Sequence, residues 1–107
     1  MKNRFMRVLV MFDLPVDTKK RRKDYTEFRK RLIKDGFFMI QFSIYGLIAR
    51  NNDDAQKHVN RVKNYLPTVG SVRVLTVTER QYASMLILVG KETAKENYLK
   101  PTDILEL

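Results

Sequence analysis

The stretch Phe5-Met6-Arg7-Val8-Leu9-Val10-Met11-Phe12-Asp13 decides the fold, because eight of its nine residues suit a buried strand and Asp13 ends it. Successive side chains point to opposite faces of a strand. One face therefore carries Phe5, Arg7, Leu9, Met11 and Asp13, and the other carries Met6, Val8, Val10 and Phe12. The run is too short for a buried helix, and Pro15 disfavours helical geometry at Leu14. We predict a central strand at residues 5–13 with both faces covered.

Length and composition indicate one small globular domain. The chain has 107 residues, 44% of them hydrophobic, and we expect a core domain at residues 1–90 and a tail at residues 91–107 for dimer and partner contacts. The absence of cysteine and the single histidine, His58, argue against disulfides, thiolate catalysis and histidine-based metal cages. No apolar run approaches the ~20 residues of a membrane span, and the charged beginning makes a poor signal peptide. We expect a cytoplasmic protein with no membrane contact.

Positive charge is concentrated in one segment. The chain has 21 Lys and Arg against 12 Asp and Glu, a net charge of +9. Residues 19–34 hold nine of the basic residues and two of the acidic ones, which leaves +7 there and +2 in the rest of the chain. A merely solvated helix face usually mixes signs, so this segment favours an anionic polymer as partner, and nucleic acid is the commonest one. The candidate nucleic-acid-binding residues are Lys19, Lys20, Arg21, Arg22, Lys23, Lys30 and Lys34.

The basic segment has the pattern of an amphipathic helix. Asp17 or Thr18 can cap its beginning, and Gly36 ends it. An apolar stripe recurs at helical spacing through Tyr25, Phe28, Leu32 and Ile33. The opposite side carries Lys19, Lys23, Lys30 and Lys34. Arg29 falls within the apolar arc, where we expect it to extend its charge to solvent or find an acidic partner.

The remaining chain reads as alternating strands and one further helix. We predict a strand at residues 37–45, extended over residues 47–49 past a kink at Gly46, and further strands at residues 71–78, 84–89 and, as a short fifth strand, 103–107. A second helix follows the capping residues 51–54 and ends at Pro67, with Ala55, Val59, Val62 and Leu66 on its apolar side.

We assign these elements to the α+β class and to the order βαββαβ of the ferredoxin-like fold, whose two helices cover one face of the sheet. The strands at 5–13 and 84–89 are apolar on both faces, so the second face needs a cover as well. A second copy of the chain, packed sheet to sheet with its C-terminal strand added to the partner's sheet edge, is the most economical cover. The pattern therefore predicts a homodimer.

Asp13 is the candidate metal-binding and catalytic residue. It ends the central strand, where a two-fold axis can bring it near its symmetry mate, and two neighbouring carboxylates favour a bound Mg²⁺ or a shared proton. Equally, Asp13 can cap the following turn or pair with Arg21 or Arg22. One carboxylate per chain is little equipment for metal-assisted phosphodiester cleavage. Without a nearby base, Ser43 and Tyr45 are better read as a polar strand face than as nucleophiles.

These residues together resemble the CRISPR-associated protein 2 family. The resemblance rests on Phe12-Asp13, the turn from Asp17 to Lys23 before a basic helix, Gly36, and Gln41-Phe42-Ser43-Ile44-Tyr45. It runs through residues 4–90, and Leu75-Thr76-Val77-Thr78-Glu79-Arg80-Gln81-Tyr82 is similar to the branch found in type II systems.

The resemblance implies a role in CRISPR adaptation, the acquisition of spacers. A homodimer would bridge dimers of the integrase, CRISPR-associated protein 1, and hold captured double-stranded DNA for insertion into the repeat array. The resemblance also implies Mg²⁺-dependent endonuclease activity on RNA or DNA, with Asp13 as the metal ligand.

Three functions therefore compete. The first is a scaffold that contacts duplex phosphates through its basic helix, and the second is a metal-dependent endoribonuclease or endonuclease using Asp13, with Arg21 or Arg22 stabilising charge. The third is a single-stranded RNA-binding module, which shares the βαββαβ order. Such modules stack bases on aromatic residues of their central strands, and residues 72–78 have none, which disfavours this third function.

Overall fold

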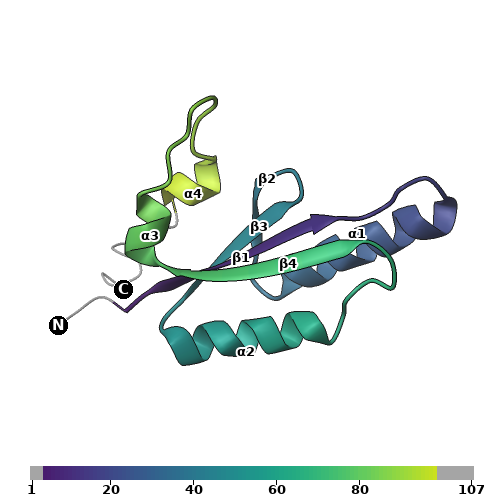
Figure 1. Ribbon diagram of the computed structural model, residues 1–107, viewed down its shortest axis with the longest axis horizontal. Coiled ribbons are helices and arrows are strands. Elements are labelled where there is room, and N and C mark those ends of the chain that lie inside the picture. The colour runs from purple at the N-terminus through teal and green to yellow at the C-terminus, as the bar shows by residue number, and fades with distance from the viewer. Residues whose placement is uncertain (1–3, 99–107) are drawn as a thin grey trace.

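The structure is a computed structural model that describes residues 4–98 (Figure 1). The strands are β1 (Met6–Asp13), β2 (Phe38–Gln41), β3 (Ile44–Ala49) and β4 (Ser71–Thr78). The helices are α1 (Lys19–Lys34), α2 (Asn52–Lys63), α3 (Glu79–Ala83) and α4 (Ala94–Tyr98). The fifth strand expected at residues 103–107 lies outside the described residues. None of the described helices has the length and apolar character needed to cross a bilayer.

The four strands form one antiparallel sheet in the order β2-β3-β1-β4. β1 lies inside this sheet, so that Val10 stands opposite Tyr45 of β3 on one side and Val74 of β4 on the other. The predicted central strand is therefore confirmed. The sheet, α1 and α2 together give the α+β class and the ferredoxin-like order βαββαβ.

Two strand assignments from the sequence are wrong. Residues 37–49 form a hairpin rather than one kinked strand, because the chain reverses between Gln41 and Ile44, where Ser43 adopts a positive φ of 66°. The Phe12 amide donates to the Ser43 carbonyl at 2.9 Å and fixes this turn to the end of β1. Residues 84–89 form no strand within the described chain and are exposed. The fourth strand of the fold is thus β4, and β3 is the third.

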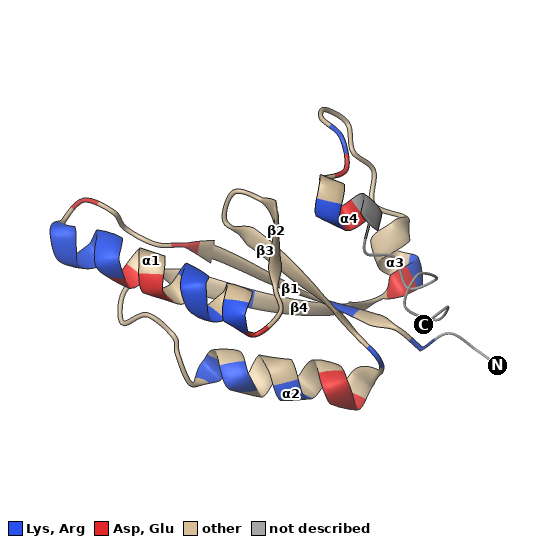
Figure 2. Ribbon diagram, turned by 180° about the vertical axis from the view of Figure 1, so that it is seen from behind, with Lys and Arg blue, Asp and Glu red and all other residues tan. Residues whose placement is uncertain are grey.

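The core lies between the sheet and the two long helices. Val8, Val10 and Phe12 of β1 pack in one cluster with residues of α1 and α2, and the rings of Phe12 and Phe28 meet edge to face at 5.3 Å. Figure 2 shows α1 and α2 from this side of the sheet. Ile33 and Leu66, both expected in the apolar stripes, are exposed.

Capping contacts set where the two long helices begin and end. The Thr18 hydroxyl accepts from the Arg21 amide at 3.1 Å, and Gly36, with φ of 106°, ends α1 as predicted. The Asn51 side chain caps α2 by accepting from the Asp54 amide at 2.8 Å. α2 ends at Lys63, four residues before Pro67, and Asn64 is its C-cap. Pro67 therefore does not end the helix itself.

The second face of the sheet carries a buried ion pair. Arg7, whose side chain is 3% exposed, donates to both carboxylate oxygens of Glu79 at 2.6 and 2.9 Å. The ring of Tyr82 lies over the guanidinium at 4.3 Å, and its hydroxyl donates to the buried Glu96. These contacts hold α3 and the start of α4 against the sheet, while Leu75 of β4 stays half exposed on the same face.

Candidate nucleic-acid interface

One side of α1 is a row of exposed cations. Figure 2 shows blue segments along most of this helix, and Lys19, Lys23, Lys30 and Lys34 all lie exposed. We call these four residues the α1 ridge. The opposite side of the helix carries Phe28 and Leu32, which are buried against the sheet. Core packing thus fixes the direction in which the ridge points, and the predicted spacing of the four lysines is confirmed.

The arginines of the first turn are already engaged. The Arg21 guanidinium pairs with Asp17 at 3.2 Å, and Arg22 donates to the carbonyl of Val16 at 3.1 Å. Both contacts tie the beginning of α1 to the loop that precedes it. Lys20, by contrast, is exposed, with no hydrogen bond or ion pair to its side chain among residues 4–98.

Asp13 lies exposed at the end of β1, opposite Ser71 of β4. Within the described chain its carboxylate has no hydrogen bond or ion pair, and the two arginines proposed as its partners bind elsewhere. Its backbone is tightly packed, because a Cβ added at Gly70 would come within 2.7 Å of the Asp13 carbonyl oxygen.

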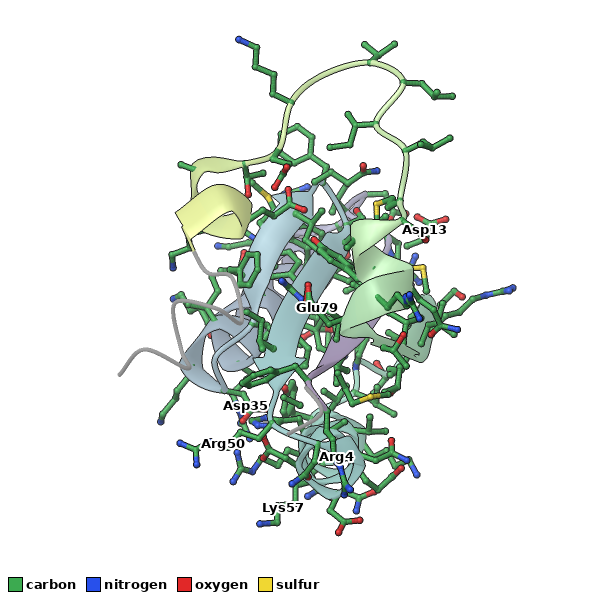
Figure 3. The ribbon with its side chains drawn as sticks, turned by 90° about the vertical axis from the view of Figure 1, so that its left-hand side faces the viewer. Arg4, Asp13, Asp35, Arg50, Lys57 and Glu79 are labelled. Atoms are coloured by element: carbon green, nitrogen blue, oxygen red, sulfur yellow. The ribbon has the colours of Figure 1, made fainter. Side chains whose placement is uncertain are left out.

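The described part of the chain does not assemble a metal site around this carboxylate. Among residues 4–98, no group of three or more His, Cys, Asp or Glu side chains is placed to hold a metal ion. Figure 3 shows Asp13 well apart from Asp35, and Asp35 is engaged with α2. Magnesium normally takes oxygen ligands in near-octahedral geometry, so one carboxylate leaves most of its positions to water or to another molecule.

The Tyr45 hydroxyl of the hairpin serves the fold. Tyr45 is 1% exposed, and its hydroxyl accepts a hydrogen bond from Arg29 Nε at 2.8 Å. This hydrogen bond raises the pKa of Arg29. The partner of Arg29 is therefore a phenol rather than the carboxylate or solvent expected from the sequence. Ser43 belongs to the hairpin turn, and within residues 4–98 no hydrogen bond joins its hydroxyl to a general base.

A second charged cluster joins α1 to α2 and was missed by sequence reasoning. Asp35, the C-cap of α1, receives Arg61 at 2.8 Å and lies 3.2 Å from Nδ1 of His58. His58 Nε2 lies 3.7 Å from Asp54, so the ring sits between two carboxylates. One signal was available, because a carboxylate at a helix C-terminus opposes the helix dipole and therefore needs cations nearby.

Comparison with known proteins identifies the family. The family model described as CRISPR associated protein Cas2 matches residues 6–85, a span that contains β1, Asp13 and the α1 ridge. The chain belongs to this family. A protein of Acidovorax ebreus named CRISPR-associated endoribonuclease Cas2 is 54% identical over 99 residues, which cover 92% of this chain and 97% of that protein.

Two further relatives carry the same name. The protein of Treponema denticola is 47% identical, covering 88% of this chain and 91% of its own length. The protein of Flavobacterium psychrophilum is 42% identical, covering 94% of this chain and 85% of its own. The family resemblance drawn from the sequence is therefore confirmed.

Proposed function

We propose that this chain acts in CRISPR adaptation, as a homodimer that bridges dimers of the integrase, CRISPR-associated protein 1, and holds captured double-stranded DNA on its α1 ridges. The observation that carries the proposal is the α1 ridge itself, four exposed lysines fixed in direction by the buried side of their helix. Membership of the Cas2 family supports the CRISPR setting.

The ridge suits a duplex without sequence preference. From Lys19 to Lys34 the helix rises by about 22 Å at ~1.5 Å per residue, and duplex DNA carries one charge per ~1.7 Å of its axis. Lysines on phosphates release counterions but read no bases, so binding is strongly salt-dependent and tolerant of sequence.

Exposed apolar surface supports the homodimer. β4 is an edge strand of the sheet, and Leu75 on its second face is half exposed. The run from Met85 to Val89 is also exposed in the isolated chain. A run of exposed apolar residues of this kind often marks an interface, and we infer that a second copy of the chain covers these features.

Salt-dependent binding of a short labelled duplex tests the scaffold. The ridge variant Lys19→Gln, Lys23→Gln, Lys30→Gln should flatten the plot of log K against log salt by about 2.7 units per chain that contacts DNA, at ~0.9 per lost phosphate contact. The control variant Lys57→Gln, Lys63→Gln, Lys91→Gln removes three exposed cations elsewhere. Equal slopes for the two variants would refute the placement of DNA on the ridge.

A second candidate is metal-dependent cleavage of RNA or DNA through Asp13. It is favoured by the endoribonuclease names of the relatives and by the exposed, unpaired carboxylate. Since residues 4–98 place a single carboxylate there, we infer that Mg²⁺ would be held with the Asp13 of a second copy as well. Bound there, the ion would supply a Lewis acid for phosphodiester hydrolysis.

A Mg²⁺ titration distinguishes the two candidates. Single-stranded RNA and duplex DNA are incubated with wild type and with Asp13→Asn, whose fold is verified by circular dichroism. Mg²⁺-dependent cutting that is lost in Asp13→Asn supports the nuclease. Absent cutting, or equal cutting by both proteins, leaves the scaffold as the function of the chain.

A further inference from the structure

A groove between α1 and α2 adjoins the α1 ridge at Lys34 and carries further cations. It has a volume of about 520 Å³ and is lined by Arg31, Lys34, Asp35, Arg61, Asn64 and Tyr65. We call it the inter-helix groove. Its two walls come from the last turn of α1 and from the end of α2, and Lys34 belongs both to the groove and to the ridge.

The charge in the groove is positive beyond what the fold needs. Three cations face one carboxylate, Asp35, whose Oδ1 already receives Arg61 at 2.8 Å and lies 3.2 Å from His58. The C-terminal dipole of α1 adds the equivalent of about half a negative charge. Three cations less one carboxylate leave two positive charges, and the helix dipole offsets only about half of one. The remaining positive charge favours an anion in the groove.

Two of the cations are held in place by the protein. The guanidinium of Arg31 lies 5.0 Å from the centre of the Tyr65 ring, and Asp35 holds that of Arg61. The planar N–H groups of arginine match phosphate oxygens, and arginine loses less conformational entropy per hydrogen bond than the flexible lysine side chain does.

An unused hydroxyl completes the groove. The Tyr65 hydroxyl is buried and has no hydrogen-bond partner within the described chain. Burial raises the pKa of Tyr65 to about 12, with the neighbouring Asp35 adding to the shift, so the hydroxyl keeps its proton at neutral pH. A buried donor without an acceptor is unfavourable, and a small shift of the Tyr65 side chain toward the groove would let a phosphate oxygen accept from it.

We propose that the inter-helix groove binds a backbone phosphodiester of nucleic acid, through Arg31, Arg61 and the Tyr65 hydroxyl, and that the binding surface thus continues from the α1 ridge onto α2. This inference rests on the proposed function. Lys34 joins the two surfaces, so a strand that follows the ridge reaches the groove at the end of α1. Asp35 repels the phosphate, and its part is to position Arg61.

Paired substitutions measure the contribution of the groove. Arg31→Gln with Arg61→Gln should lower the salt slope for a short duplex by about 1.8 units per contacting chain, equivalent to about a 60-fold loss of affinity at 0.1 M salt. The matched control Lys57→Gln with Lys63→Gln removes the same charge from α2 positions that do not line the groove. The variant Arg31→Lys with Arg61→Lys keeps the charge and should keep most of the slope.

Two outcomes would contradict the proposal that the groove binds phosphate, and they distinguish it from the proposal for the ridge. If the double Gln variant matches its control while the ridge variant still flattens the slope, the groove is wrong and the scaffold stands. If wild type binds no duplex, both proposals fail.

A measurement on the wild-type protein avoids any loss of folding. The ¹⁵Nε resonances of Arg31 and Arg61 should shift on titration with the duplex, and that of Arg50 should not. A response to inorganic phosphate without a response to duplex, or no response at all, overturns the proposal.

Discussion

Removing the Glu79 carboxylate should destabilise the protein by about 3 kcal/mol, because it leaves Arg7 as a buried, unpaired charge. Arg7 is 3% exposed, its Nη1 atom has no partner within residues 4–98, and both of its hydrogen bonds to Glu79 would be lost. The lower end of the range of 3–5 kcal/mol applies, since the Glu79 side chain is 21% exposed and its site admits some water. At roughly 4–8 °C per kcal/mol, Glu79→Ala should lower the melting temperature by about 12–24 °C.

Urea unfolding followed by circular dichroism measures this loss, at one fixed protein concentration because dimerisation would add to the apparent stability. The double variant Arg7→Met with Glu79→Leu removes both charges and should stay within about 1 kcal/mol of wild type. A cost below about 1 kcal/mol for Glu79→Ala, or a double variant as unstable as the single one, would refute the reasoning that an unpaired charge is the cause.

Two further predictions concern single residues. Gly70→Ala should destabilise the protein by about 1–2 kcal/mol because Gly70 has a positive φ of 106°, and further because the added Cβ would contact the Asp13 carbonyl. Gly90 has a φ of 99° with open space around it, so Gly90→Ala should show only the cost of the positive φ. Equal melting temperatures for the two variants would contradict the predicted clash. Tyr65, with its pKa raised to about 12 against an ordinary value of 10, should be among the last tyrosines to ionise in absorbance at 295 nm. The folded state holds the Tyr65 proton more tightly than the unfolded state does. The resulting contribution to the free energy of unfolding is therefore present below pH 10 and is lost between pH 10 and 12. Tyr65→Phe should remove this loss of stability at high pH.

The elements with a strong periodic pattern were predictable from the sequence. The apolar run ending at Asp13 gave the central strand, and the spacing of Phe28 and Leu32 gave the orientation of α1. The hairpin was missed because its turn at Phe42-Ser43 has no Gly, Pro, Asn or Asp, and Ser43 adopts its positive φ without the residue types that announce one. The run at 84–89 was predicted as a strand because an apolar pattern indicates that residues need to be buried, but not which element or molecule buries them.

The candidate site divides in the same way. Asp13 and the α1 ridge were predictable because each lies within one element, where spacing fixes direction. The inter-helix groove joins Arg31 to Arg61 and Tyr65, which lie 30 and 34 residues further along the chain. Periodicity within one helix cannot place such residues together, since their meeting depends on how α2 packs beside α1.

Insertion of a labelled duplex into a repeat-containing plasmid by the purified integrase tests whether this chain acts by holding DNA on α1. Wild type, Asp13→Asn and the ridge variant (Lys19→Gln, Lys23→Gln, Lys30→Gln) are each added to the integrase, and inserted label is counted. We expect insertion near the wild-type level with Asp13→Asn and at least tenfold less insertion with the ridge variant. Normal insertion with the ridge variant would show that this chain does not act by holding DNA on α1, and loss of insertion with Asp13→Asn would point to the metal-dependent nuclease instead.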